Sequence, residues 1–474
     1  MSKRFYRVFL PCCVLAAVVL ACTGSSLDEE MPGGMLGTYL ESGQIAVDPR
    51  TETSFVMRQS IAQAAPGAPP PTEAARRALY AVRADATSAE LVTRLDDTSD
   101  ARLMFPATGT LLMSEQGGGE LLRLLDGETH REIRRRSTRA RYHGTRLSPS
   151  GRWIAVADND DDDVPIHLLD AATLETIPIP HDGQWLEATW MNGSDRLAAI
   201  VAYDIGQPAE RMRLLVWDIS ALEQKGFEIG ELGYWVEPEI DVTVEGVGPD
   251  IFFSFTWVGV SPNDRFAVFP VLGQPETADG QRPHRLLVLE LASADVRVVE
   301  DAYGPVGFTP DGSTIVSYRY GDGTGETRSF LRLVDVQTLE TEDVELPLLG
   351  LPEYFVSRDG NLVVVADLSG QDQLVLVDID QQRVTQMAGP GVAFRSFVAR
   401  PGHRELWLAD AGLYRVDLMA ATVESITLSV AAAHVNYLPS RDQLVLVPED
   451  VSRLAFFDPN GRNIVREVAI PDPR

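Results

Sequence analysis

The chain has 474 residues, of which 45% are hydrophobic, and its 69 acidic and 41 basic side chains give a formal net charge of −28 at pH 7. This length and hydrophobic content suffice for a large core or for several domains. The negative charge excludes general nucleic-acid binding, because that activity needs a basic surface that neutralises phosphates.

The N-terminal segment predicts export and lipidation. Residues 1–22, MSKRFYRVFLPCCVLAAVVLAC, begin with basic residues and continue in an apolar stretch that ends at Leu20, a pattern typical of a secretory signal peptide and too short for a spanning helix. The last four letters, VLAC, resemble the bacterial lipobox. This resemblance implies that Cys22 is lipidated and becomes the first mature residue. We expect a signal peptide over 1–21 and a lipidated, flexible tether over 22–42; the alternative is an ordinary secretion signal or a membrane anchor.

A lipid on Cys22 would hold the protein at a membrane of the bacterial cell envelope. Two acyl chains anchor a protein where one does not, since each buried CH2 contributes about 0.8 kcal/mol. Thr23 follows Cys22, whereas the inner-membrane retention signal of enteric bacteria has Asp there, so the sequence favours the outer membrane. The chain has no cysteine beyond Cys22, which excludes a disulfide, a Cys-ligated zinc and a Cys nucleophile in the mature domain.

Residues 43–95 predict a first group of strands. The segments 45–60 and 79–95 form a candidate blade, although Arg83 stands where later units have an acidic residue. Between them, the Pro-rich AAPGAPPPTEAARR (64–77) indicates a long loop near 61–77.

From residue 105 onward, a turn followed by an apolar run recurs along the chain. Proline presets φ and glycine accepts positive φ, so the polar part predicts a tight turn. The apolar run after it predicts a buried strand. The clearest copies are LSPSGRWIAV (147–156), VSPNDRFAVF (260–269), FTPDGSTIVS (308–317) and VSRDGNLVVV (356–365).

A second pattern follows each copy: a strand that ends in an acidic residue, a tight turn and another strand, as in LRLVDVQTLETEDV (331–344). Four strands per unit at a period of about 43 residues indicate a β-propeller. A longer spacing between Asp218 and Glu290 marks an insertion near 220–256. The strand-ending acidic residues are Asp126, Asp170, Asp218, Glu290, Asp335, Asp378, Asp417 and Asp458.

These units resemble the WD40-like and Tol-type propeller repeats, in which a similar SPDG turn precedes a strand that ends in Asp. The resemblance implies an all-β fold, a single β-propeller of four-stranded blades over residues 43–474. We expect one closed ring of eight or nine blades, or of seven if the weaker units are additions to it. Propellers host unrelated activities, so the resemblance does not define a function.

The acidic run DNDDDD (158–163) lies in a loop whose position follows from strand direction. With the strands of a blade labelled a to d, the b–c and d–a loops share one end of the blade, and the a–b and c–d turns share the other. The b–c loops differ between units, and variable loops on a repeated scaffold usually carry binding. Asp158, Asp160 and Asp162 are candidate Ca2+ ligands, but the run lacks the EF-hand spacing, so a solvated hairpin tip is the alternative.

An arginine-rich stretch, THREIRRRSTRARYHGTR (129–146), is a local exception to the acidic charge. It falls on strand d of one unit and on the loop into the next. One interpretation is a site for phosphate, a lipid headgroup or an acidic polysaccharide; the other is pairing with the acidic loop and charged protection of an outer strand edge. The candidate binding residues are Arg134, Arg135, Arg136, Arg139 and Arg141.

The sequence contains no recognisable catalytic motif. None of its seven histidines forms HExxH, and no GxSxG elbow occurs. No catalytic residue and no cofactor other than the candidate Ca2+ is identified. Two functions stay open: a membrane-anchored envelope lipoprotein whose propeller binds an envelope protein or a polysaccharide, and a lactonase-like hydrolase with a metal on the propeller axis.

Overall fold

The computed structural model describes residues 38–40, 45–60, 76–95, 100–106, 108–116, 120–138, 146–156, 166–179, 185–204, 210–220, 238–249, 258–273, 282–320, 329–347, 352–356, 362–367, 373–388, 396–400, 402–409, 412–429 and 431–473. The expected signal peptide, Cys22 and most of the expected tether lie outside these residues, as do most of the long loops expected near 61–77 and 220–256. Every element with described bounds is a β-strand, and these strands form nine antiparallel sheets.

The chain divides into two compact units. We call Thr38–Ala101 together with Val392–Arg474 the terminal unit. It contains β1 (Thr38–Leu40) and three four-stranded sheets. The first sheet is β2 (Ile45–Val47), β3 (Ser54–Ser60), β4 (Arg76–Val82) and β5 (Glu90–Leu95); the penultimate sheet is β31 (Ser396–Arg400), β32 (Glu405–Ala409), β33 (Leu413–Asp417) and β34 (Thr422–Ile426); the last sheet is β35 (His434–Leu438), β36 (Gln443–Val447), β37 (Arg453–Asp458) and β38 (Asn463–Ala469).

The middle unit, Arg102–Gly391, contains the other six sheets. The first two of these sheets contain β6 (Asp100–Met104, which begins before the unit boundary), β7 (Thr110–Gln116), β8 (Glu120–Asp126) and β9 (Glu132–Thr138), and then β10 (Arg146–Leu147), β11 (Trp153–Val156), β12 (Ile166–Asp170) and β13 (Thr176–Ile179). The next two contain β14 (Trp185–Trp190), β15 (Arg196–Tyr203), β16 (Arg211–Asp218) and β17 (Ile240–Glu245), and then β18 (Val247–Pro249), β19 (Gly259–Val260), β20 (Phe266–Gly273), β21 (His284–Glu290) and β22 (Asp295–Glu300). The last two contain β23 (Tyr303–Phe308), β24 (Thr314–Tyr320), β25 (Ser329–Asp335) and β26 (Thr341–Leu346), and then β27 (Pro352–Val356), β28 (Leu362–Asp367), β29 (Gln373–Asp378) and β30 (Arg383–Ala388).

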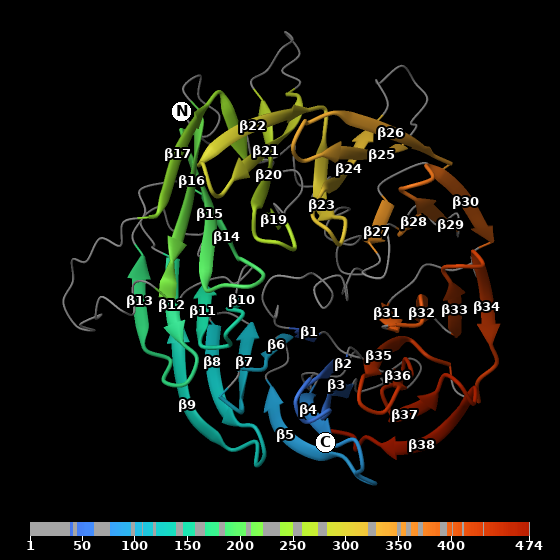
Figure 1. The fold of residues 1–474 in the computed structure, drawn as a ribbon. Coiled ribbons are helices and arrows are strands. Elements are labelled where there is room, and N and C mark those ends of the chain that lie inside the picture. Colours follow the sequence, from blue (N-terminus) through green and yellow to red (C-terminus); the bar gives the residue numbers. More distant parts are fainter. Residues whose placement is uncertain are drawn as a thin grey trace, which may run out of the picture. The chain divides into compact units, whose positions relative to one another are not determined.

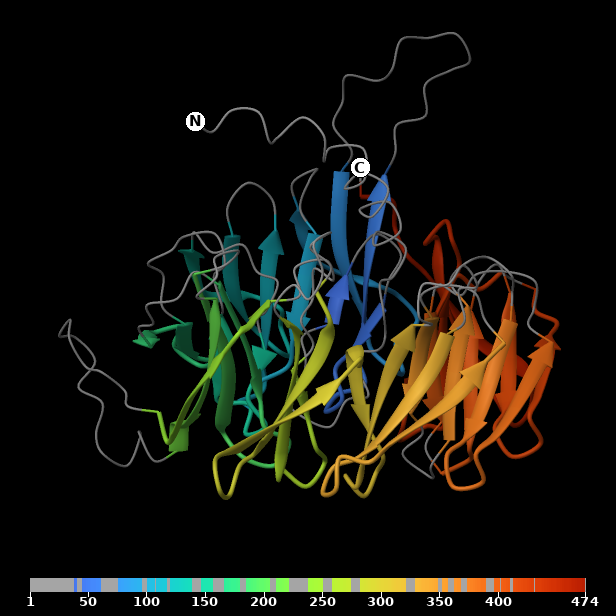
Figure 2. The same cartoon turned by 90° about the horizontal axis from the view of Figure 1, so that it is seen from above.

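Apart from β1 and β19, strands that follow one another in the chain are neighbours in their sheet, as Figure 1 shows. The strands of a sheet run side by side between two ends, where the turns and loops lie (Figure 2). In one sheet the first strand is in two parts, because β18 and β19 both pair with β20. This organisation confirms the expected all-β propeller fold. Residues 45–95 form the first sheet, so the candidate ninth blade is a sheet of the same kind as the others.

In seven of the nine sheets, the acidic residue at the end of the third strand accepts hydrogen bonds from the c–d turn that follows it. All eight expected acidic residues are the last residues of their strands. In the turn after β25, Asp335 Oδ1 accepts hydrogen bonds from the backbone N–H groups of Gln337 and Thr338 at 2.9 and 2.7 Å, and from the Thr338 hydroxyl at 3.1 Å. Leu339 then takes a left-handed conformation with φ 59° and closes the turn through its N–H to the Asp335 carbonyl. Equivalent positive-φ residues are His130, Leu174, Ala294, Gln382, Ala421 and Arg462.

The a–b turns use positive φ as the sequence predicts. Gly151 and Gly312 have φ 71°, and Asp264 takes the same conformation, with φ 53°, where SPND replaces SPSG. Successive turns of the middle unit also contact one another. Asp195 accepts the Ser150 N–H at 3.1 Å, and Asp264 in turn accepts N–H groups of the turn at residues 192–193, at 2.7 and 2.8 Å.

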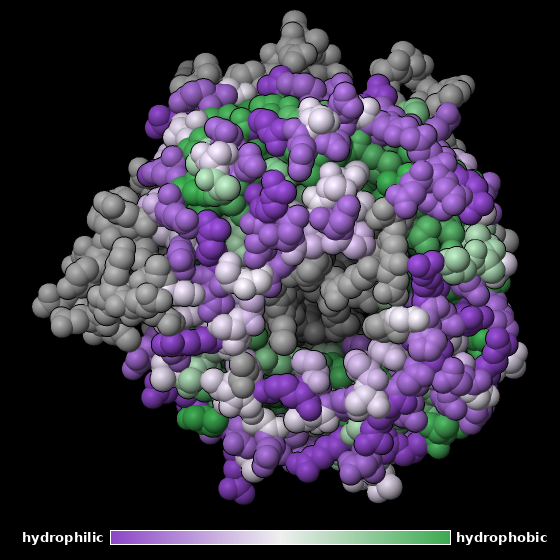
Figure 3. Space-filling view, in the orientation of Figure 1, coloured by the Kyte–Doolittle hydropathy of each residue, from purple (hydrophilic) through white to green (hydrophobic). Residues whose placement is uncertain are grey.

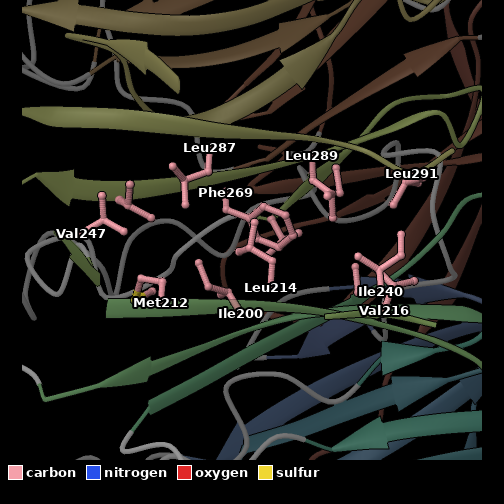
Figure 4. Close-up of a cluster of buried hydrophobic side chains, with 14 of the residues drawn as sticks. Ile200, Met212, Leu214, Val216, Ile240, Val247, Phe269, Leu287, Leu289 and Leu291 are labelled. Carbon is pink, nitrogen blue, oxygen red and sulfur yellow. The ribbon is translucent and has the colours of Figure 1, made fainter. Parts of the chain in front are cut away.

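The hydrophobic core lies between the faces of neighbouring sheets. One cluster joins sheet β14–β17 to sheet β18–β22, with side chains that alternate along each strand (Figure 4). Ile200, Met212 and Leu214 come from the first of these sheets, and Phe269 and Leu287 from the second; all five are fully buried. Because inner strands such as β15 and β20 are buried on both faces, they read as continuous apolar runs, which is why the sequence shows them so clearly.

Candidate functional site

The b–c loops connect the second strand of each sheet to the third. The sequence predicts that these loops vary between units and carry binding. Only one of them, residues 448–452 between β36 and β37, lies wholly within the described residues. The candidate Ca2+ ligands Asp158, Asp160 and Asp162 lie outside them. Within the described ranges, no three His, Cys, Asp or Glu side chains are grouped to hold a metal.

The candidate arginine patch is described over residues 134–136, on β9, the fourth strand of its sheet, where the sequence places it. Arg139 and Arg141 lie outside the described residues. The side chain of Arg135 is 70% exposed and its Nε lies 3.7 Å from Glu132 Oε1. This arginine is therefore largely solvated.

The two arginines beside it reach the neighbouring sheet. The Arg134 guanidinium donates to the Thr173 carbonyl, and Arg136 Nη1 donates to the Leu174 carbonyl at 2.8 Å. Both carbonyls belong to the c–d turn between β12 and β13. Arg134 and Arg136 thus join two sheets, and a role of the patch in binding stays a prediction.

The same contact recurs elsewhere in the chain. Arg297 on β22 donates to the Val336 carbonyl at 2.6 Å, in the c–d turn after β25. Arg466 on β38 donates to the carbonyls of Ala84 and Ala86 at 2.6 and 2.7 Å, in the c–d turn of the first sheet. An arginine on the fourth strand therefore repeatedly holds the c–d turn of a neighbouring sheet.

Other arginines pair with acidic residues across the third and fourth strands of their own sheet. Such cross-strand pairs stabilise a sheet and place charge at its outer edge. The Arg285 Nε lies 2.6 Å from Glu300 Oε2, and the Arg332 Nε lies 2.7 Å from Asp343 Oδ1. Similar pairs are Arg123–Glu132, Arg213–Asp241, Arg415–Glu424 and Arg453–Glu467.

The most buried ionic cluster lies in the terminal unit, between the penultimate and last sheets. The side chain of Arg400, at the end of β31, is only 3% exposed. Its Nε donates to Asp442 Oδ1 at 2.7 Å, its Nη1 to Glu405 Oε2 at 3.1 Å and its Nη2 to Asn460 Oδ1 at 2.8 Å. Glu405 also accepts from Arg415 Nε at 2.8 Å. We call these five residues the Arg400 cluster.

Ionisation within the Arg400 cluster favours the charged forms. Hydrogen bonds from Arg400 hold the pKa of Asp442 well below its usual value. Burial raises the pKa of Glu405, but hydrogen bonds from Arg415 and Arg400 outweigh it and the net pKa is lowered. Burial and a 2.9 Å hydrogen bond to Asp442 raise the pKa of the neighbouring Tyr437 to about 12. At neutral pH these groups are held in fixed protonation states, which suits a structural joint rather than proton transfer.

A second buried ion pair lies at the loop end of the middle unit. The Glu210 side chain is 3% exposed, and its Oε2 lies 2.5 Å from Arg282 Nη2. Arg282 also donates to the carbonyls of Gly273 and Leu272, at 2.6 and 3.2 Å. Gly248 leaves room for the carboxylate, since a Cβ there would come within 1.9 Å of Glu210 Oε1. Glu210 precedes β16 and Arg282 precedes β21, so the pair fixes the bases of two b–c loops.

Sequence reasoning missed both ionic clusters. Their partners come from different sheets, and nothing in the spacing of Arg400 and Asp442, or of Glu210 and Arg282, indicates that they meet. For Glu210 and Arg282, unlike the Arg400 cluster, the sequence did offer a hint, because both residues lie beside strands at the ends of variable loops.

The surface shown in Figure 3 is mainly hydrophilic, with hydrophobic side chains in separate small patches. The described part of the chain contains no helix long and apolar enough to cross a membrane.

Comparison with known proteins supports the fold and leaves the function open. No family model matches the sequence, and no curated protein matches it. A structure of the eukaryotic initiation factor is 12% identical, with a TM-score of 0.51 over 77% of this chain and 87% of that one. The dihydro-heme d1 dehydrogenase NirN in complex with DHE is 13% identical, with a TM-score of 0.47 over 76% and 73% of the two chains. Oligogalacturonate lyase in complex with manganese is 14% identical, with a TM-score of 0.39 over 89% and 100%. Of these three, the initiation-factor structure alone has a TM-score above 0.5, and at 12% identity its likeness concerns the fold alone.

Proposed function

We propose that this chain is a lipoprotein of the bacterial cell envelope, anchored through Cys22, whose propeller is a binding scaffold. The observation that carries the proposal is the buried Glu210–Arg282 pair, which fixes the bases of two variable loops. A rigid base beneath loops that differ from one another is the arrangement by which repeated folds present a binding surface.

Charge supports a protein partner with a basic surface. The chain carries a net charge of −28. Its described arginines are largely engaged in contacts within and between sheets, as in the Arg400 cluster and the cross-strand pairs. An acidic surface attracts and orients a cationic partner and speeds its association at low ionic strength.

The binding surface is tested by photo-crosslinking at two exposed positions of the terminal unit. Glu449 lies in the b–c loop of the last sheet, and Ala420 lies in the c–d turn of the penultimate sheet. A photoreactive residue at Glu449 should form salt-sensitive crosslinks to a basic envelope protein in cells, and one at Ala420 should not. Equal crosslinking at both positions would contradict the proposal, as would binding to a polysaccharide instead of a protein.

The anchor and the enzymatic alternative have separate tests. The Cys22→Ala protein should leave the membrane fraction or stay unprocessed; partition like that of the wild type would refute lipidation. Elemental analysis of the purified protein addresses the hydrolase alternative. A stoichiometric metal together with lactone hydrolysis would overturn the scaffold role.

A further inference from the structure

The joint between the first and last sheets brings together the two ends of the described chain. Each of these sheets is complete in itself, and they share no strand. Their facing side chains form one apolar cluster, to which Val56, Ala78 and Tyr80 contribute from the first sheet and Val445 and Phe456 from the last. The joint therefore has no strand pairing and depends on contacts of side chains with one another and with backbone groups.

Polar contacts connect the two sheets at several points. Arg466 lies over the Phe456 ring, 3.8 Å from its centroid, and donates to the Ala84 and Ala86 carbonyls at 2.6 and 2.7 Å. At the a–b turns, Glu52 Oε1 accepts the Ser440 N–H at 2.7 Å. The Arg466 guanidinium makes two hydrogen bonds across the joint, while its contact with the Phe456 ring lies within the last sheet and holds the guanidinium in place.

Chain connectivity distinguishes this joint from the other one in the terminal unit. The penultimate and last sheets are linked by the short segment 427–433. The first and last sheets are linked only through residues 96–433. The entropic cost of bringing two chain segments together rises with the length of the connection, so a short link favours re-closure more than a long one.

We propose that the first sheet acts as a clasp that Arg466 holds closed. When the clasp opens, the first sheet separates from the last sheet as an intact sheet, while the penultimate and last sheets stay joined. Local opening of this kind occurs in contiguous cooperative units below the free energy of global unfolding. The clasp is a conformational device of the fold and does not depend on the proposed lipid anchor or binding role.

Thiol labelling of the native full chain tests the clasp. With Cys12, Cys13 and Cys22 replaced by alanine, an introduced cysteine is the single thiol. Ala78→Cys places the thiol in the joint between the first and last sheets, and Ala455→Cys places it in the joint between the penultimate and last sheets. Both alanines are buried. When closing is faster than labelling, the rate reports the population of the open form. We expect the Ala78→Cys thiol to react faster than the Ala455→Cys thiol.

Arg466→Gln is the deciding variant. We expect it to accelerate labelling of the Ala78→Cys thiol by about tenfold or more, since hydrogen bonds from a charged donor exceed neutral ones, and to leave the Ala455→Cys thiol unchanged. Arg462→Gln is the matched control, because Arg462 is half exposed and pairs with Glu424 of the penultimate sheet.

Three outcomes would overturn the clasp: equal labelling at both positions, equal acceleration at both by Arg466→Gln, or no acceleration at either. If Arg466→Gln fails to fold, Arg466→Lys keeps the charge and loses the paired donors. It should give a smaller acceleration confined to the Ala78→Cys thiol. A lysine variant that labels like the wild type at both positions would equally defeat the proposal.

Discussion

Replacing Arg400 by methionine tests whether the Arg400 cluster stabilises the terminal unit. Methionine keeps an unbranched apolar side chain but removes all donors. The change breaks the contacts to Asp442, Glu405 and Asn460. Both carboxylates keep a second partner, because Glu405 still accepts from Arg415 and Asp442 still accepts from Tyr437.

The expected loss follows from burial. Removing one partner of a fully buried ion pair costs about 3–5 kcal/mol. The Asp442 side chain is 34% exposed, so solvent compensates for part of the loss. Together with the remaining partners, this lowers the expected cost of Arg400→Met to about 2–3 kcal/mol, which corresponds to a fall in Tm of about 4–12 °C for a unit of this size.

The pH dependence gives an independent readout. In the folded state the pKa values of Asp442 and Glu405 lie below their ordinary values. Their stabilising contribution is therefore complete above about pH 4–5, where both groups are ionised even in the unfolded chain, and is lost as the pH falls through the lowered folded values. The gap in Tm between wild type and Arg400→Met should be full at pH 7 and shrink below about pH 4.

Calorimetric scans of wild type, Arg400→Met and the control Arg265→Met decide the question. The Arg265 side chain is 54% exposed, and its Nη2 lies 3.9 Å from Glu290 Oε1, so its loss should cost at most about 1 kcal/mol. If Arg400→Met is no less stable than the control, or if its deficit does not depend on pH, desolvation cancels attraction in the cluster and the reasoning fails.

Three further predictions concern single positions, each measured by denaturant unfolding. Gly248→Ala should cost about 1–3 kcal/mol through overpacking against Glu210, whereas Gly193→Ala, whose Cβ would lie 3.3 Å from the nearest side-chain oxygen, should cost less; equal costs would contradict the close packing. Gly402 has φ 75° and open space around a Cβ, so Gly402→Ala should cost about 1–2 kcal/mol and Gly402→Asn less, and equal values would rule out a conformational cause. Asp335→Ala should cost about 0.5–1.5 kcal/mol and Asp335→Asn less, because asparagine keeps the acceptor; the advantage of the wild type over Asp335→Asn should fade below about pH 4, since backbone hydrogen bonds lower the pKa of Asp335, and a constant difference would refute this explanation.

The fold was predictable because its determinants are local and repeated. A turn such as SPSG, an apolar run and a strand that ends in Asp recur in one order, and each part has its own physical cause. Asp170 shows the reason for the acid: its Oδ1 accepts the N–H groups of Ala172 and Thr173, both at 2.9 Å, and so closes the c–d turn. The sequence identified the position of this residue, and the structure explains it.

The contacts between sheets were not predictable in the same way. Arg134 and Arg136 stand out in the sequence as a cluster of charge, yet their partners are the backbone carbonyls of Thr173 and Leu174, almost 40 residues away. An arginine that donates to a backbone carbonyl leaves no trace in the residue types around it. Sequence reasoning can therefore find where arginines gather, but it cannot tell which of them face a neighbouring turn.

A strongly shifted pKa often marks a functional residue, because catalytic sites use burial and charge to bring it near the working pH. In the described residues the shifts run in the opposite direction. Every carboxyl group with a resolved shift has its pKa lowered, as Asp241, Asp343 and Asp442 show, and in these three the partner that lowers it is an arginine. A lowered pKa keeps a carboxylate ionised and paired, whereas a general acid needs a raised one. The carboxyl groups of Asp241, Asp343 and Asp442 thus join strands and sheets through their charge, and their lowered pKa values follow from that structural role.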